Sequence, residues 1–437
     1  MEPRPNLPMR PWLLLAASVL ISITFWHWAV HVVAPVTTAT VLAKGKPLGN
    51  NSDLYPRWLG TRELLLHGRD PYSPEVTREI QIGFYGRPLN PQNPSDPTDK
   101  ESFVYPLYVA FLLAPTVRLP FQTASEVFRW LLLGSIALSV PLWMNAIGFR
   151  LKWSLTVSVM LLSTSSSPAV SEYFQQNLAA LVLFFLASAA AAAVGNWLAL
   201  SGFLLALATV KPNTAAPLVL WFLLWALAEW KQRNRLIWSF AGTMAALLVA
   251  TQALSPHWMG RFLTAVREYS TYGMDPSIIQ LLLPSWLAWL VEAGLILSLV
   301  IVCWRWKNAA AGSEQFSWAL AWAGTVTLAV LPKLAAYNEL LLIPALLVLA
   351  ARYRKILALG LLARAMTRGA FACLIWQWLA AMALSIASFF LPATWLRAAG
   401  PIPDYTSLAL GPLTLVAIVL TSFSLGSEAG PSTVTNA

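Results

Sequence analysis

A long succession of apolar segments, separated by short polar turns, constrains this chain more than any other feature. The first segment covers residues 11–33, and the others follow one another between residues 103 and 423. About 20 apolar residues are enough to cross the hydrocarbon core of a bilayer as a helix. A helix satisfies its own backbone hydrogen bonds, so it can cross lipid without a closed barrel. The pattern predicts an all-α polytopic membrane protein, a bundle of about 12–13 transmembrane helices.

The composition agrees with a membrane protein and excludes an ordinary soluble one. The 437 residues are 57% hydrophobic and only 11% charged, whereas soluble domains carry about 25% charged residues. The net charge is +10, but the basic residues form short groups between apolar segments, as at residues 231–235 and 352–355. This is the pattern of cytoplasmic loops. We therefore expect the lipid bilayer as the surroundings and no nucleic acid as a partner.

The apolar pattern predicts one integral-membrane domain, residues 1–437. Its expected parts are a first transmembrane helix at 11–33, an external loop with short helices at 34–102, a transmembrane bundle at 103–426 and a flexible tail at 427–437. Two arginines, Arg4 and Arg10, precede the first helix and favour a cytoplasmic N-terminus. The loop then lies outside. The segment 103–117 is short for a full span, and we interpret it as re-entrant or strongly tilted.

The outer loop contains a carboxylate, Asp53, just after the first membrane helix. Such a carboxylate can act as a general base toward a sugar hydroxyl, or hold a metal ion or a cationic group. It can equally be the N-cap of a helix formed by residues 54–66, because Asp is a favoured N-cap. Spacing alone favours the cap.

Further polar groups are predicted on the same side of the membrane. Residues 172–177 read EYFQQN, and their amides suit sugar hydroxyls or a phosphate as well as a helix end. Lys211 is a lone cation opposite the basic cytoplasmic clusters, so it either pairs with a lipid phosphate or extends to the interface. Lys333, Tyr337 and Asn338 form another external group.

Together these groups suit a substrate with an anionic, lipid-linked head group. A transporter or flippase of lipid-linked sugars is the alternative. Transporters more often carry ionisable groups near the middle of their helices. Here such groups lie near one face, which favours an enzyme.

The order of the motifs resembles that of glycosyltransferase family 87, a family of the GT-C superfamily of integral-membrane enzymes. An Asp, an aromatic residue, an apolar helical run and a G-x-x-P-Y turn correspond to Asp53, Tyr55, residues 64–66 and residues 68–72. The family's tyrosine-proline-proline, G-Q-x-N and Lys-Pro motifs and its late tyrosine correspond to Tyr105-Pro106-Leu107, Phe174-Gln175-Gln176-Asn177, Lys211-Pro212 and Tyr337. The second proline, the glycine and the family's late histidine are absent.

The resemblance implies a GT-C-like bundle that transfers a hexose such as mannose from a polyprenyl-phosphate donor to a glycolipid or glycan acceptor. Transfer would take place with inversion at the external face of a bacterial cytoplasmic membrane. Asp53 would be the general base and Lys211 would bind the donor phosphate, without a cofactor or a required divalent metal. The residues expected to bind substrate are Tyr55, Arg57, Tyr72, Tyr105, Gln175, Asn177, Lys211, Lys333, Tyr337 and Asn338.

Overall fold

The structure is a computed structural model that describes residues 11–43, 50, 52–90, 92–93, 96–273, 275–332 and 335–426. The predicted tail at 427–437 lies outside the described residues. The elements of the first half are α1 (Pro11–Trp28), η1 (Ala29–Val33), α2 (Ala34–Ala43), α3 (Leu54–His67), α4 (Pro74–Tyr85), α5 (Val109–Leu113), η2 (Ala114–Thr116), α6 (Phe121–Ala146), α7 (Trp153–Thr164), α8 (Ser167–Gln175), α9 (Ala179–Val194), α10 (Leu198–Ala208) and α11 (Pro212–Ala228). Those of the second half are α12 (Trp230–Leu254), α13 (Trp258–Tyr272), α14 (Ile278–Leu282), α15 (Ser285–Arg305), α16 (Glu314–Val330), η3 (Ala336–Leu342), α17 (Ile343–Ala351), α18 (Tyr353–Ile356), α19 (Leu361–Ala387), α20 (Ala393–Ala399), α21 (Ile402–Ser407) and α22 (Leu410–Gly426).

The all-helical membrane architecture predicted from the sequence is confirmed, and the described residues form no strand. Within the described ranges, six helical runs are long and apolar enough to cross a membrane, namely Pro11–Val36, Phe121–Ala146, Trp230–Leu254, Ser285–Arg305, Leu361–Ala387 and Ile402–Ser424. The bent pair of α8 and α9 makes a seventh span if it counts as one. Four further apolar helical runs have 10–17 residues. Fewer helices are therefore full-length than the 12–13 apolar segments indicated, because a helix packed inside the bundle need not match the thickness of the lipid.

The first helix is longer than predicted. Its helical run continues through the π-helical turn η1 into α2 and reaches Ala43, so the predicted external loop begins with helix at residue 34. The π turn adds a residue to one turn of the helix, as such bulges do. The helix thus extends about ten residues beyond the point that the hydropathy change indicated.

The segment predicted to re-enter or tilt does not span. It contains the five-residue helix α5 and the short turn η2, and five helical residues rise only about 7.5 Å. Proline and buried aromatic residues hold this segment against α3, where the Trp58 indole donates to the Thr116 carbonyl over 3.2 Å. The segment therefore packs against α3.

Two helices, α3 and α4, shape the segment that was predicted to be an external loop. Gly68 ends α3 with a φ of 65°, a left-handed conformation that glycine adopts without steric cost. The Ser73 hydroxyl then accepts from the amide of Val76 and begins α4. Asp70 Oδ1 accepts from the Tyr72 amide over 3.1 Å, and this bond closes the turn around Pro71.

Glycines allow two close helix contacts that support the rest of the bundle. A Cβ at Gly202 of α10 would collide with the Leu236 carbonyl of α12. A Cβ at Gly324 of α16 would lie 2.6 Å from the Leu341 carbonyl of η3. Small residues let helix backbones approach in membrane proteins, where packing rather than water drives association.

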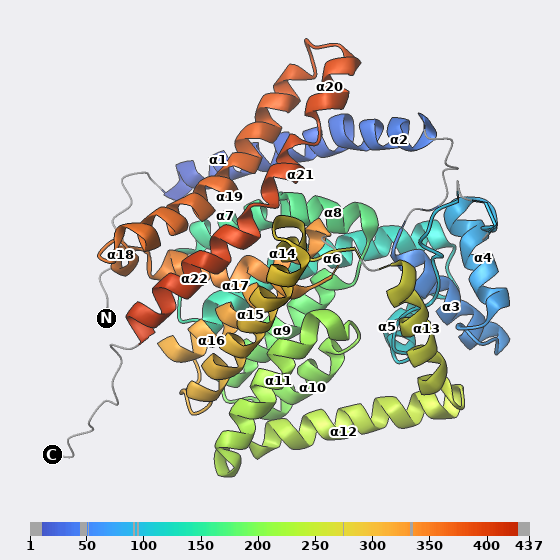
Figure 1. Cartoon of the computed structure of the whole chain (residues 1–437), viewed down its shortest axis with the longest axis horizontal. Coiled ribbons are helices and arrows are strands. Elements are labelled where there is room, and N and C mark those ends of the chain that lie inside the picture. Colours follow the sequence, from blue (N-terminus) through green and yellow to red (C-terminus); the bar gives the residue numbers. More distant parts are fainter. Residues whose placement is uncertain are drawn as a thin grey trace.

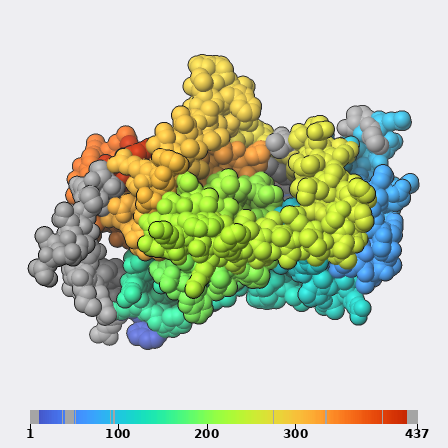
Figure 2. Space-filling view, turned by 90° about the horizontal axis from the view of Figure 1, so that it is seen from below, coloured from blue at the N-terminus to red at the C-terminus, as the bar shows by residue number. Residues whose placement is uncertain are grey.

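The helices surround α9 and α16, which contain more buried residues than any other described helix. Figure 1 shows α12 along one edge of the bundle, with α13 turning back from its end toward α3 and α5. Arg261 of α13 donates to Asp70 Oδ2 over 2.8 Å. In the space-filling view, α13 (yellow) lies beside the outer-loop helices (blue) at one end of the molecule (Figure 2). A cavity opens between them.

Candidate active site

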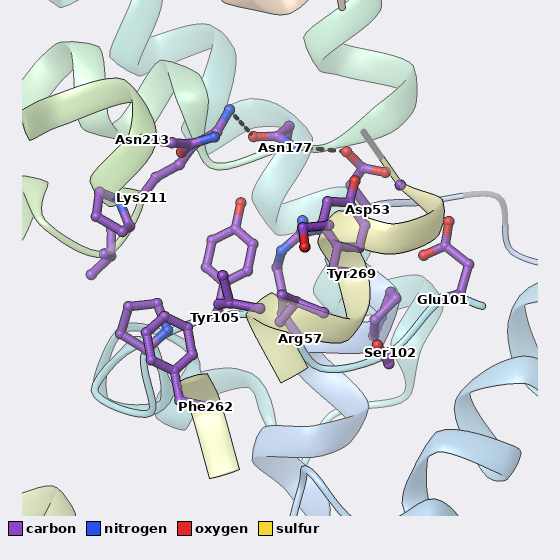
Figure 3. A pocket seen from close by; sticks show the side chains of 18 of the residues that line it. Asp53, Arg57, Glu101, Ser102, Tyr105, Asn177, Lys211, Asn213, Phe262 and Tyr269 are labelled. Carbon is purple, nitrogen blue, oxygen red and sulfur yellow. Dashed lines mark hydrogen bonds between the residues drawn. The ribbon is translucent and has the colours of Figure 1, made fainter. Parts of the chain in front are cut away.

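The described residues form a cavity with a volume of about 520 Å³. Its walls come from the start of α3, residues 99–106, the turn between α8 and α9, the turn between α10 and α11, α13 and η3. A cavity of this size is in the range of small-molecule sites. Polar side chains from segments far apart in the sequence meet in it (Figure 3).

Asp53 stands at the N-cap position of α3, but its side chain makes no cap hydrogen bond. Its backbone amide donates to the Gln175 carbonyl over 2.7 Å, which ties it to the end of α8. Its carboxylate oxygen Oδ2 instead accepts from Asn177 Nδ2 over 2.7 Å. The capping interpretation, which spacing favoured, therefore does not describe the side chain. The carboxylate faces the cavity.

A sharp bend places Asn177. The axes of α8 and α9 differ by 119°, and Gln176 between them has a left-handed φ of 54°. The buried Gln176 side chain accepts from the hydroxyls of Ser52 and Ser125 over 2.7 and 2.9 Å. It also donates to the Ser125 carbonyl over 2.6 Å. These bonds fix the turn, and the next residue, Asn177, then points into the cavity.

Lys211 completes a chain of three polar groups. Its ammonium donates to Asn177 Oδ1 over 2.8 Å and to Asn338 Oδ1 over 3.1 Å. The residue is only 6% exposed, and its ammonium lies 4.7 Å from the centre of the Tyr337 ring. The Asn177 amide thus bridges the carboxylate of Asp53 and the ammonium of Lys211, as the dashed lines in Figure 3 show. Bonds to charged groups are the stronger kind.

The short helix η3 contributes two residues to the wall of the cavity, Tyr337 and Asn338. Tyr337 donates from its hydroxyl to Asp53 Oδ2 over 3.4 Å, and Asn338 holds Lys211. Gly324 of α16 allows η3 to lie this close to the core. Both side chains are buried, so the position of η3 fixes them.

Arg57 is a second cation in the cavity. Its guanidinium lies 4.1 Å over the Tyr105 ring, a cation–π contact. Burial lowers the pKa of Arg57, but the neighbouring Tyr105 and Asp53 oxygens raise it, and the net shift is upward. The guanidinium therefore keeps its charge and can face an anion in the cavity.

The two ends of the cavity differ in chemistry. Carboxylates and a hydroxyl from Asp99, Glu101 and Ser102 line the end nearest the outer loop, and Figure 3 shows Glu101 and Lys211 on opposite sides of Asp53. On α13, Leu263 and Val266 line the cavity and are 59% and 38% exposed. One wall is thus apolar and open to the surroundings of the protein.

Of the predicted site residues that the structure describes, seven line this one cavity and three do not. The seven are Asp53, Arg57, Tyr105, Asn177, Lys211, Tyr337 and Asn338. Lys333 lies outside the described residues. The other three, Tyr55, Tyr72 and Gln175, are placed elsewhere.

Those three side chains turn away for local reasons. The Tyr55 ring packs edge-on against Phe121, 4.8 Å away. The Tyr72 hydroxyl donates to the Tyr105 carbonyl over 2.6 Å, so it supports the wall from behind. Gln175 points outward and donates to the Ser171 hydroxyl over 3.1 Å. Only its carbonyl, which accepts from the Asp53 amide, takes part in the site.

Sequence reasoning missed several cavity residues. Asp99, Glu101 and Ser102 lie at the end of the outer loop, and Tyr269 and Phe262 lie on α13. An amphipathic pattern with tyrosines at positions 269 and 272 was visible in the sequence. The pattern did not indicate which face of α13 would pack against residues 99–102.

Metal ligands are not grouped in the described part of the chain, which contains no cluster of three His, Cys, Asp or Glu side chains suited to a metal ion. The cavity has two carboxylate positions on different walls, Asp53 and the Asp99–Glu101 segment.

A helical membrane bundle that gathers a carboxylate, an ammonium and a guanidinium in one cavity has the features of a membrane-embedded group-transfer enzyme. The model of glycosyltransferase family 87 matches residues 103–332, more than half of the chain. The chain is thus a glycosyltransferase and belongs to this family. No curated protein and no solved structure matches it. Asp53, Tyr337 and Asn338 lie outside the matched range, so their roles rest on the geometry.

Proposed function

We propose that the protein transfers a hexose from a polyprenyl-phosphate donor to a hydroxyl of a glycolipid or glycan acceptor, at the external face of a membrane. The observation that carries the proposal is the chain of contacts from the Asp53 carboxylate through Asn177 to the Lys211 ammonium. It puts a proton acceptor and a positive charge in one cavity, held a fixed distance apart. Glycosyl transfer from a phosphate needs both groups.

Asp53 is the general base in this proposal. The acceptor hydroxyl gives its proton to the Asp53 carboxylate while its oxygen forms a bond to the anomeric carbon of the donor. The bond between that carbon and the phosphate oxygen breaks at the same time, and polyprenyl phosphate leaves with the electron pair. Attack opposite the leaving group inverts the anomeric centre. A positioned base of this kind contributes about 10²–10⁴-fold to a rate.

The donor phosphate lies between Arg57 and Lys211. Negative charge grows on the phosphate as its bond to the sugar breaks, and fixed cations stabilise that charge most in a site with little water. Lys211 is already bonded to two amides, so its charge is held in place before the donor arrives. The planar guanidinium of Arg57 suits phosphate oxygens in pairs.

Two other parts of the cavity wall face the remaining parts of the substrates, which are the polyprenyl chain of the donor and the acceptor sugar. The exposed apolar side chains Leu263 and Val266 of α13 line the path of the polyprenyl chain from the lipid. The acceptor sugar enters from the opposite end, where Glu101 and Ser102 accept or donate hydrogen bonds to hydroxyls. Figure 3 shows Asp53 between Lys211 and Glu101, and in this proposal its carboxylate meets the acceptor hydroxyl.

The test is transfer by the purified protein in proteoliposomes. Radiolabelled polyprenyl-phosphate mannose and a matched nucleotide-mannose are offered separately, with alkyl mannoside and a membrane glycolipid extract as acceptors. We expect labelled, covalently extended acceptor from the lipid-linked donor alone. Movement of intact donor across the bilayer without extended acceptor would support a flippase instead. Transfer from the nucleotide-sugar alone would refute the donor class.

A further inference from the structure

A buried acid, Glu172, lies directly behind the cavity without lining it. It belongs to α8, one turn before the bend, and its exposure is 0%. A charged or polar side chain is expensive to bury unless it has partners. What Glu172 bonds to therefore indicates why the chain keeps a carboxyl group here.

Glu172 is bonded to both sides of the turn that carries Asn177. Its backbone carbonyl accepts from the Gln176 amide over 2.7 Å, which closes the end of α8. Its side-chain oxygen Oε1 accepts from the Ala180 amide over 3.1 Å, in the first turn of α9. One residue thus holds the helix before the bend and the helix after it.

The second bond replaces a missing cap. The N-cap of α9 is Leu178, which has no side-chain cap hydrogen bond and no oxygen to offer. The first amides of a helix have no partner within the helix, and a buried helix end without one is unfavourable. Glu172, in the preceding helix, supplies the acceptor oxygen that the side chain of Leu178 lacks.

We infer that Glu172 is a positioning residue: it fixes the bend between α8 and α9 so that the Asn177 amide stays between Asp53 and Lys211. The expected effect of Glu172 on kcat rests on the proposed function, whereas its role in fixing the bend between α8 and α9 does not. Glu172 does not line the cavity, so it acts through Asn177 and does not touch the substrate. Without this bond the amide of Asn177 loses its fixed direction.

Two substitutions separate the acceptor oxygen from the bulk of the side chain. Glu172→Met keeps a similar volume but has no oxygen to accept from Ala180, whereas Glu172→Gln keeps one. We expect Glu172→Met to lower kcat about 10- to 100-fold with little change in the donor KM, because leaving the buried Ala180 amide without an acceptor has an effect of this size. Glu172→Gln should retain activity within about fivefold of wild type, because an amide oxygen still accepts the same bond.

The matched control is Gln377→Met. Gln377 is also buried, and its Oε1 accepts from the Ser167 amide over 2.8 Å at the other end of α8. It caps the same helix away from the cavity. We expect Gln377→Met to lower the melting temperature as much as Glu172→Met does while leaving kcat within about threefold of wild type.

A double-mutant cycle with Asn177→Ala tests whether Glu172 acts through Asn177. If it does, adding Glu172→Met to Asn177→Ala should reduce kcat by no more than about twofold further, because residues in one network are not additive. Gln377→Met should be additive with Asn177→Ala. A full multiplicative loss in the Glu172→Met, Asn177→Ala double variant would overturn the inference.

Hydrogen exchange gives a second readout that needs no activity. In Glu172→Met the amides of residues 176–180 should exchange faster than in wild type, while Glu172→Gln and Gln377→Met leave them unchanged. Unchanged protection in Glu172→Met would overturn the inference even if the protein transferred no sugar from the chosen donor. If the wild-type protein transfers no sugar from the chosen donor but Glu172→Met still exchanges faster than wild type, the inference about Glu172 is supported and only the proposed substrate is refuted.

Discussion

Replacing Asn177 by alanine removes the link between the two charged groups of the site. The amide donates to Asp53 over 2.7 Å and accepts from Lys211 over 2.8 Å. In Asn177→Ala the Asp53 carboxylate keeps the 3.4 Å contact with Tyr337, and Lys211 keeps its bond to Asn338. Neither group is lost, but both lose the partner that fixes their separation.

The expected magnitude follows from these bonds. A hydrogen bond to a charged group contributes about 1.5–3 kcal/mol, and about 1.4 kcal/mol corresponds to a factor of ten in rate. If the bond to Asp53 serves only to orient the base, we expect kcat to fall about 10- to 150-fold. The donor KM should change less than about threefold, because the Lys211 charge remains beside the phosphate.

The assay is steady-state transfer from radiolabelled polyprenyl-phosphate sugar in proteoliposomes, with the donor concentration varied. Gln175→Ala is the matched control, since that side chain lies two residues away and points outward to Ser171. We expect the control to stay within about twofold of wild type, because the Gln175 carbonyl that holds Asp53 is unaffected. A wild-type kcat in Asn177→Ala, or an equal loss in Gln175→Ala, would refute this reasoning.

Three further substitutions test the remaining parts of the site. Lys211→Met removes the fixed cation, so kcat/KM should fall about 10²–10³-fold at unchanged acceptor KM, and a loss confined to the acceptor KM would contradict its role. Arg57→Gln should raise the donor KM about 10-fold or more, and Arg57→Lys should recover only part of this because it lacks the planar fork; equal KM values in all three proteins would exclude a phosphate contact. Tyr337→Phe should lower kcat less than about fivefold, because its hydroxyl is 3.4 Å from Asp53, a weak bond, and a loss as large as that of Asn177→Ala would show that Tyr337 rather than Asn177 orients the base.

The helical membrane fold and much of the cavity could be predicted from the sequence. The length of an apolar segment identifies a membrane helix, because only a helix or a closed barrel satisfies its backbone hydrogen bonds inside a bilayer. Asp53, Asn177 and Lys211 were predicted to lie on the same side of the membrane, but their spacing along the chain does not show that they meet in one cavity. The structure adds that the Asn177 amide touches both of the others.

The direction of individual side chains could not be predicted. Gln175 and Gln176 are chemically identical neighbours, but the left-handed φ of Gln176 turns one side chain outward and buries the other. Such a conformation is stabilised by Ser52 and Ser125, which are 124 and 51 residues away from Gln176 in the sequence. Tyr55 likewise suits a sugar site in its motif but packs against Phe121.

Long-range assembly explains the cavity residues that sequence reasoning missed. Glu101 and Tyr269 carry no motif, and only the return of α13 to the outer loop brings them to the same cavity. The ion pair between Arg261 and Asp70 holds that helix in place. Neither partner indicates the other from local sequence.

The most direct test of the central claim is the transfer activity of Asp53→Asn. Asparagine has nearly the same shape and can still contact Tyr337, so the protein should fold and bind donor as the wild type does. It cannot accept the proton of the acceptor hydroxyl, and we expect kcat to fall about 10²–10⁴-fold, the range of a general base. Transfer within about threefold of wild type, with an unchanged donor KM, would contradict the claim that Asp53 is the base.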